Sequence, residues 1–185
     1  MSNGQLRPPV GGDDHSAGPT DAPVTLVEYG DYECPYCGEA YPIVKQLQEA
    51  MGDRLRFVFR NFPLAEVHTH AEHAAEVSEA AADADRFWEM HDTLYEHQDH
   101  LGDGALVRYA QQLGMDPNEV RGDLEDGTYA DRVRRQFMGG VRSGVNGTPS
   151  FFINGERFDG AWNDAGAFLR ALQEAADAAG ASTRS

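Results

Sequence analysis

The sequence predicts an α/β fold into which a block of helices is inserted. Three observations carry this prediction: a strand, helix and strand pattern within residues 24–62, a long stretch without strand character at 63–143, and a two-stranded pattern at 145–158 followed by a closing helix. Because a βαβ unit places its two strands in parallel with a right-handed crossover, we expect the first two strands to be neighbours in one sheet.

The first part of the predicted core spans residues 23–62. Residues 24–29 are rich in β-branched and aromatic side chains and predict a strand. Residues 35–51 carry apolar side chains at helical spacing, and Pro42 inside this segment should kink the helix. Residues 55–62 predict the second strand.

The helical insertion is assigned to residues 63–143, because nothing in this stretch has the pattern of a strand. One helix should begin after Asp116, which is a good N-cap followed by a proline at the first helical position. The remaining helices are expected at 70–84, 86–98, 104–113 and 128–143. This is too much helix for a single crossover, so we predict an all-helical subdomain.

The second part of the core is assigned to residues 144–179. An Asn-Gly pair between apolar runs in 145–158 predicts a β-hairpin, and Pro149 directly precedes its first strand. Residues 164–179 predict the closing helix, with Phe168 and Leu172 facing inward.

Both ends of the chain are predicted to be loosely held. Residues 1–22 are rich in Gly, Pro, Asp and Ser and are interpreted as a flexible arm, whereas residues 180–185 are expected to form a frayed tail.

The most reactive feature of the sequence is its pair of cysteines, Cys34 and Cys37, which are its only two. Pro35 suits the first position of a helix, which places Cys34 at the N-cap and Cys37 one turn further on. Unpaired amides and the helix dipole favour an anion there, so the pKa of the Cys34 thiol should fall from ~8.5 into the range of about 3.5–7.5. Cys34 is therefore the candidate nucleophile, and Cys37 is the candidate resolving thiol.

Two other interpretations of the cysteine pair stay open. A zinc site needs four ligands, which His68, His70 and His73 could complete, although their spacing and the junction of a strand with a helix are unusual for such a site. A structural disulfide between Cys34 and Cys37 would close a very short loop and stabilise little chain. Redox chemistry is the interpretation that fits the helical context best.

Composition narrows the classes of partner. The 185 residues carry a net charge of −16, which disfavours nucleic acid and anionic membranes as partners. The acidity and the single lysine, Lys45, also suit a halophilic source, as a hypothesis only. No apolar stretch approaches the ~18–20 residues of a membrane span, and the first 22 residues lack the apolar region of a secretory signal. We expect a cytoplasmic protein, with an exported mature form as the alternative.

Several motifs together resemble those of the DsbA-like thiol:disulfide oxidoreductases, a family with a thioredoxin fold and a helical insertion. Over residues 20–178, the resemblance rests on these segments: Cys34-Pro35-Tyr36-Cys37, Pro42, Asn61-Phe62-Pro63-Leu64, His68-Thr69-His70-Ala71, Phe87-Trp88-Glu89-Met90-His91 and Thr148-Pro149. The fold class predicted is therefore thioredoxin-like with an inserted all-helical subdomain.

The resemblance implies roles for particular residues. Cys34 attacks or is attacked, Cys37 resolves, and Glu28 stands where the family carries a buried acid that can take the proton of Cys37. Pro149 should follow a cis peptide bond, with Thr148 offering backbone groups to a substrate strand beside Cys34.

Pro35 and Tyr36 are also expected to contact substrate. Tyr36 stands where DsbA proteins often carry a histidine that stabilises the thiolate, so strong oxidising power is not implied.

Each role has a plainer alternative. Glu28 could face water at a strand end, and Pro149 could be an ordinary trans proline that enters a strand. The histidines of the helical block are interpreted as surface or cap residues rather than metal ligands; they are His68, His70, His73, His91, His97 and His100.

The function expected is exchange of a Cys34–Cys37 disulfide or dithiol with protein or small-molecule thiols, with no organic cofactor and no metal. A redox partner would recycle the cysteine pair. The alternatives are a non-catalytic binding module with a thioredoxin fold and, third, a Cys/His zinc-binding protein.

Overall fold

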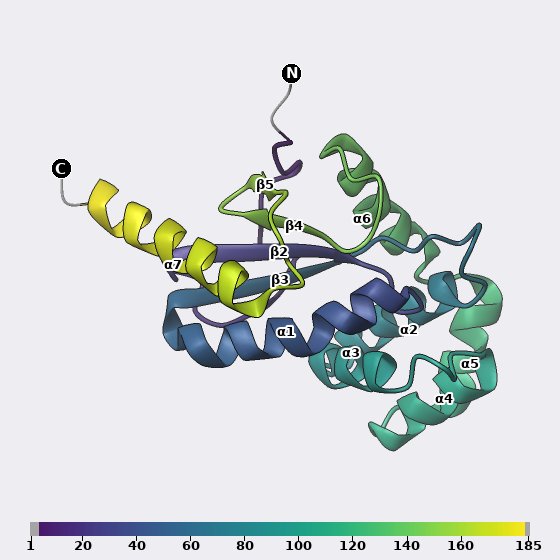
Figure 1. Ribbon diagram of the computed structural model, residues 1–185. Coiled ribbons are helices and arrows are strands. Elements are labelled where there is room, and N and C mark those ends of the chain that lie inside the picture. The colour runs from purple at the N-terminus through teal and green to yellow at the C-terminus, as the bar shows by residue number, and fades with distance from the viewer. Residues whose placement is uncertain (1–3, 184–185) are drawn as a thin grey trace. The chain divides into compact units, whose positions relative to one another are not determined.

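The structure is a computed structural model that describes residues 4–183. Its elements, in chain order, are β1 His15–Ala17, β2 Val24–Gly30, α1 Pro35–Met51, β3 Leu55–Asn61, α2 Ala71–Asp83, α3 Phe87–Glu96, α4 Asp103–Gln112, α5 Pro117–Asp126, α6 Ala130–Arg142, β4 Ser150–Ile153, β5 Glu156–Phe158 and α7 Ala165–Ser182 (Figure 1). These elements confirm the predicted α/β class, and most boundaries fall within two residues of those expected from the sequence.

The described chain forms two compact units. The sheet unit consists of residues 4–29, 39–60 and 139–183, and the helical unit consists of residues 30–38 and 61–138. The short segment 30–38, which contains both cysteines, therefore belongs with the helices rather than with most of the strand and helix that flank it.

In the sheet unit, the strands lie in the order β1-β3-β2-β4-β5. The two strands predicted first, β2 and β3, are neighbours, and nearly all of their residues are buried. Strand β4 runs antiparallel to β2, with Glu28 opposite Phe151, and β5 runs antiparallel to β4. Burial on both faces suits the Val, Leu, Phe and Tyr side chains of these central strands, which also bury Glu28, Arg60 and Asn61.

The predicted hairpin is formed by β4 and β5, and its turn is Asn154-Gly155. Both residues have positive φ, +48° and +84°, which is the conformation that a two-residue hairpin turn requires. The Asn154 side chain also accepts a hydrogen bond of 2.8 Å from the Thr25 amide of β2. Phe168 of α7 is fully buried and stacks on Phe158 of the hairpin, as the inward position of this residue predicted.

The N-terminal segment corrects one prediction, because residues 4–22 do not form a flexible arm. Strand β1 pairs antiparallel with β3, and Leu6 is buried while its amide donates to the Gly155 carbonyl. The composition of residues 4–22 predicted flexibility because the segment has few apolar side chains to bury. Backbone hydrogen bonds hold this segment in place, and composition does not reveal them. Residues 1–3 of the predicted arm lie outside the described residues.

Arg60 of β3 holds this segment onto the sheet. Its guanidinium makes a two-point contact with Asp14, at 2.7 and 2.9 Å, and also donates to the Tyr29 hydroxyl and the Pro8 carbonyl. Burial acts to raise the pKa of Asp14, but hydrogen bonds from Arg60 and the Gly11 amide outweigh it and leave that pKa below its ordinary value. The Asp14–Arg60 pair is therefore a largely buried, charged anchor.

In the helical unit, α2 packs against α3, α4 and α5. Most of α2 is buried, including Glu79. That carboxylate accepts hydrogen bonds from the side chains of Asn61 and Gln136, and the Gln136 side chain in turn accepts from the Asn61 amide. One hydrogen-bond network thus links buried polar side chains of α2, α6 and the end of β3.

The helix ends follow the predicted signals where these exist. Asp116 caps α5 by accepting from the Asn118 amide, and Gly127 ends that helix in the left-handed conformation. Helix α7 continues to Ser182, so residues 180–182 belong to the helix rather than to the frayed tail expected from residue 180; residues 184–185 lie outside the described part of the chain. Within residues 4–183, no helix is long and apolar enough to cross a bilayer.

We expect Asp14→Asn to lower the free energy of unfolding by about 2–3 kcal/mol at neutral pH, because it leaves a buried guanidinium without its charged partner. Since the pKa of Asp14 is lowered in the folded protein, its contribution is present above the pKa of the unfolded state and is lost as the pH falls through the folded value. The difference in free energy of unfolding between wild type and Asp14→Asn should therefore shrink as the pH falls. Urea denaturation of the two proteins between pH 7 and pH 3 measures this difference.

Asp177→Asn is the matched control, since Asp177 pairs with Arg54 in a solvent-exposed contact. We expect this variant to lose less than about 1 kcal/mol. Equal losses in the two variants, or a loss in Asp14→Asn that does not shrink in acid, would contradict the anchoring role of Asp14.

Candidate active site

The two cysteines lie where β2 passes into α1. Cys34 immediately precedes Pro35, the first residue of α1, and its carbonyl accepts the Gly38 amide at 3.1 Å. Cys34 is thus at the N-cap, as the sequence predicted, with Cys37 in the first turn. Both cysteines are buried, at 4% and 0% exposure, whereas Tyr36 between them is 61% exposed. The two residues between the cysteines, Pro35 and Tyr36, are thus exposed while both sulfurs are covered.

A buried aspartate organises the loop that carries the cysteines. The Asp31 carboxylate accepts hydrogen bonds from the amides of Glu33 and Leu64, at 2.8 and 2.9 Å, and lies 2.7 Å from Nδ1 of His68. The Asp31 backbone also touches both cysteines: its carbonyl accepts the Cys34 amide, and its amide points at Cys37 Sγ at 3.5 Å. Asp31 was not identified from the sequence. Its side chain accepts from the amide two residues later in an Asx-turn, and an aspartate just after a predicted strand is a typical signal of such a turn.

Two histidines face the acidic side chains of this loop. His68 contacts Asp31, and His70 contacts Glu33 through both its amide and its ring, at 2.6 and 3.0 Å. Burial acts to lower the pKa of His68, but the hydrogen bond and charge of Asp31, followed by the charges of Cys34 and Glu33, raise it above its ordinary value. His68 is therefore held closer to its protonated form than an exposed histidine would be.

Gln98, in the connection between α3 and α4, fixes the backbone of the same loop. Its amide nitrogen donates to the carbonyls of Tyr32 and Cys34, at 2.8 and 2.9 Å. A side chain on Gly38 would collide with the Gln98 carbonyl oxygen, so the glycine after Cys37 makes room for this contact. Neither residue was identified from the sequence, because their contact joins positions sixty residues apart in the chain.

The histidines of the helical block are not all surface residues. His91 is 3% exposed, and its ring contacts the Tyr32 hydroxyl at 3.0 Å within an aromatic cluster, so the interpretation of His91 as a surface or cap residue is wrong. His68, His70 and His73 each contact a carboxylate, the last of them that of Asp103. Among residues 4–183, no group of three or more His, Cys, Asp or Glu side chains is arranged to hold a metal ion.

Glu28 and the Thr148-Pro149 pair lie in the sheet unit, whereas Cys34 to Cys37 lie in the helical unit. Glu28 is 2% exposed in the middle of the sheet, so the alternative in which it faces water is wrong. The Thr148–Pro149 peptide bond is cis, directly before β4. The roles assigned to Glu28, Thr148 and Pro149 beside the cysteines stay predictions.

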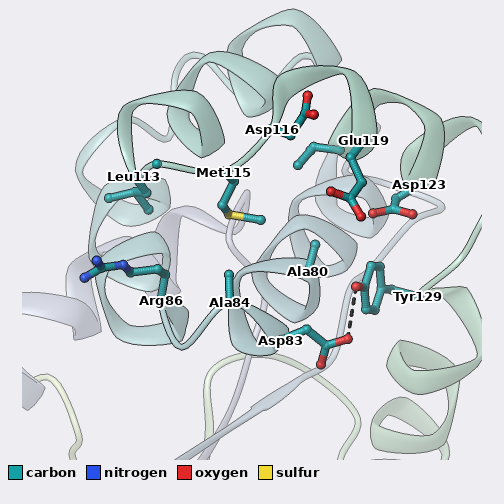
Figure 2. A pocket seen from close by; sticks show the side chains of 12 residues that line it. Ala80, Asp83, Ala84, Arg86, Leu113, Met115, Asp116, Glu119, Asp123 and Tyr129 are labelled. Atoms are coloured by element: carbon teal, nitrogen blue, oxygen red, sulfur yellow. Dashed lines mark hydrogen bonds between the residues drawn. The ribbon is translucent and has the colours of Figure 1, made fainter.

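A cavity of about 490 Å³ lies in the helical unit (Figure 2). It is not lined by any of the predicted site residues Cys34, Cys37, Glu28, Thr148 and Pro149. Its wall includes Asp83, Asp116, Glu119 and Asp123. Burial first, and then the hydrogen bond to Asp83, raises the pKa of Tyr129 to about 12. The Tyr129 hydroxyl is therefore a hydrogen-bond donor to Asp83 rather than an acid.

Comparison with known proteins gives a family and a fold. The family model described as Thioredoxin matches residues 11–174. The fold matches BdbD from Bacillus subtilis, with a TM-score of 0.79, 25% identity and 94% of each chain covered. It also matches α-DsbA1 from Wolbachia pipientis, with a TM-score of 0.82 at 17% identity over 98% of this chain and all of that one. A thioredoxin-like oxidoreductase from Silicibacter pomeroyi is 24% identical, with 97% of each chain covered and a TM-score of 0.76.

Among curated proteins, the chain is similar to part of longer ones. It is 46% identical over 180 residues to "Na(+)/H(+) antiporter NhaA 1" of Salinispora arenicola and to "Na(+)/H(+) antiporter NhaA 3" of Salinispora tropica. These matches cover 97% of this chain but only 27% of each relative, so the chain spans about a quarter of their length. The family match and the fold together show that the chain belongs to the thioredoxin family and has the fold of the DsbA-type thiol-disulfide oxidoreductases.

Proposed function

We propose that the protein is a thiol:disulfide oxidoreductase that cycles Cys34 and Cys37 between a disulfide and a dithiol. The observation that carries this proposal is the placement of Cys34 at the N-cap of α1, with Cys37 one turn later, in a chain of the thioredoxin family. Helix N-termini favour anions, so this position suits a reactive thiolate.

The exchange proceeds in two substitutions at sulfur. In the reducing direction, the Cys34 thiolate attacks a substrate disulfide, which breaks that bond, forms a mixed disulfide and releases one substrate thiolate that takes up a proton. Cys37 then loses its proton and attacks Cys34 Sγ, which releases the second substrate thiol and leaves the Cys34–Cys37 disulfide. Two electrons pass to the substrate, and the reverse sequence oxidises a substrate dithiol.

The remaining assignments follow the resemblance to the DsbA-like family. Glu28, whose side chain is buried in the sheet, accepts and returns the proton of Cys37. Tyr36 and Pro35 contact substrate at the mouth of the site, and Thr148 and Pro149 offer backbone groups to an extended substrate. No metal or organic cofactor takes part, and a thiol or disulfide partner recycles the pair.

A second candidate is a non-catalytic module that docks a partner. The observation that favours it is the match to a quarter of the length of proteins named as Na⁺/H⁺ antiporters, in which this fold is joined to other protein. A zinc-binding protein is third, since it would need further ligands beyond Cys34 and Cys37. The retained Cys-Pro-Tyr-Cys sequence at a helix start favours the redox function over both.

Cys34→Ser should abolish both insulin reduction and disulfide exchange with glutathione, because no sulfur remains to attack at the helix N-terminus. Cys37→Ser should retain alkylation at Cys34 and accumulate a mixed disulfide, because the resolving thiol is missing. An insulin-reduction assay measures the first activity, and mass spectrometry of the proteins after incubation with oxidised glutathione measures disulfide exchange and the accumulated mixed disulfide.

The wild-type protein also distinguishes the three candidates. Activity with both substrates supports the oxidoreductase, whereas full inactivity of a correctly folded, reduced wild-type protein points to the docking module. Stoichiometric zinc in the purified protein would overturn the redox assignment. Alkylation of Cys37 before Cys34 near neutral pH would reverse their assigned roles.

Glu28→Gln should slow the second substitution by about tenfold or more, since it removes a buried group that exchanges a proton with Cys37. The amide is close in size to the carboxylic acid, so the packing of β2 should be retained. Stopped-flow measurement of mixed-disulfide decay gives this rate, with Glu156→Gln as the control because Glu156 of β5 is exposed. Equal decay rates in wild type and Glu28→Gln would remove Glu28 from the mechanism.

A further inference from the structure

The Asp31 carboxylate presents an electrostatic problem for the chemistry of Cys34. Its side chain is fully buried, and it belongs to the loop whose backbone bonds to Cys34 and Cys37. A buried negative charge disfavours a second negative charge nearby, and the thiolate of Cys34 would be that second charge. A redox site built on this loop therefore needs a compensating positive charge.

Among the hydrogen-bond donors to Asp31, His68 is the one that can carry such a charge. The others are the backbone amides of Glu33 and Leu64, which supply dipoles only. His68 Nδ1 lies 2.7 Å from Asp31 Oδ2, and the His68 side chain is only 20% exposed, so solvent screens the pair weakly. Pro35 and Tyr36, the exposed residues between the cysteines, have no positive charge to contribute.

His68 is also coupled to Cys34 itself. The charge of the Cys34 thiolate is one of the causes that raise the pKa of His68, after the hydrogen bond and charge of Asp31. Coupling between two titrating groups is reciprocal, because the same interaction energy enters both equilibria. A thiolate that makes His68 easier to protonate is therefore itself made easier to form by the protonated His68.

We propose that His68 is a positioning residue that, as an imidazolium bound to Asp31, supplies the positive charge that stabilises the Cys34 thiolate. This inference rests on the proposed redox function and names the residue that sets how oxidising the pair is. His68 acts through the charge balance of the loop rather than by contact with substrate. Replacing its charge should therefore change the acidity of Cys34 without removing either sulfur.

Among the described residues, Glu33 is a further charged group that acts on His68, and His70 in turn contacts Glu33. Glu33 adds to the negative charge beside His68, and it is itself bound to His70 at 3.0 Å. The His70 side chain is 46% exposed, so water screens its charge far more than that of His68. His70 is thus the matched control: it has the same chemistry, lies two residues away and binds an acid of the same loop.

The test compares His68→Gln, His70→Gln and His68→Lys, each combined with Cys37→Ser so that Cys34 is the only thiol. The pKa of Cys34 is read from thiolate absorbance at ~240 nm and from iodoacetamide rates across pH, with circular dichroism as the check on folding. We expect His68→Gln to raise the pKa of Cys34 by about half a unit to one unit, which slows alkylation near pH 6 about three- to tenfold. His70→Gln should change the rate less than about twofold, and His68→Lys should lie closer to wild type.

The same substitutions with both cysteines present give the redox consequence. At equilibrium, the protein disulfide and two glutathiones convert to the protein dithiol and glutathione disulfide. His68→Gln should make the Cys34 thiolate, and with it the reduced protein, less stable. We therefore expect this equilibrium to shift toward the protein disulfide by up to about tenfold, equivalent to ~30 mV. A pKa of Cys34 in His68→Gln that equals that in His70→Gln, or falls below it, would overturn the inference.

The two proposals fail in distinguishable ways. Alkylation reports the acidity of Cys34 whether or not the protein turns over a substrate. If the pKa of Cys34 is raised in His68→Gln but the wild-type protein exchanges no disulfides, the charge assignment is supported and the oxidoreductase is rejected. Normal exchange by the wild type, with an unchanged pKa in His68→Gln, would do the reverse.

Discussion

The carboxylate of Asp31 is the group on which the geometry of the cysteine loop depends. It joins the turn after β2 to the segment before α2, through the amides of Glu33 and Leu64 and through the ring of His68. Gln98 holds the backbone of the same turn from the connection after α3. These contacts explain why residues 30–38 belong with the helices, and they place Cys34 at the N-cap before any substrate arrives.

Charge shapes the rest of the protein in a similar way. At a net charge of −16, carboxylates outnumber the available cations, and several histidines act as their partners. Burial acts to lower the pKa of His73, but the hydrogen bond and charge of Asp103 raise it overall, as Asp31 does for His68. In the sheet unit, Arg60 binds Asp14, because the arginine guanidinium can satisfy a carboxylate, a hydroxyl and a carbonyl together.

In this chain of the thioredoxin family, Cys34 lies at the N-cap of α1. Side chains from the helical unit contact the loop that carries this cysteine. In this chain Asp31, His68 and Gln98 meet around the loop, and two of the three come from beyond β3. The relatives named as antiporters match over about a quarter of their length, so the same scaffold also occurs within much longer proteins. The contacts that shape the cysteine loop lie within this chain and do not depend on the further protein to which the scaffold is joined in those relatives.

The sequence alone determined the order of the elements from β2 onward, the hairpin and the position of Cys34, because these depend on local signals such as apolar periodicity, a proline at a helix start and an Asn-Gly turn. It also predicted the acid at Glu28 through the resemblance to a known family, and the structure adds that this side chain is buried. Its errors had one cause, since hydrogen bonds between distant residues leave no local pattern. Pairing of β1 with β3 ordered a segment of disordered composition, and burial beside Tyr32 removed His91 from the surface. The meeting of Asp31 with His68, and of Gln98 with the Cys34 carbonyl, was likewise decided only when the chain folded back on itself.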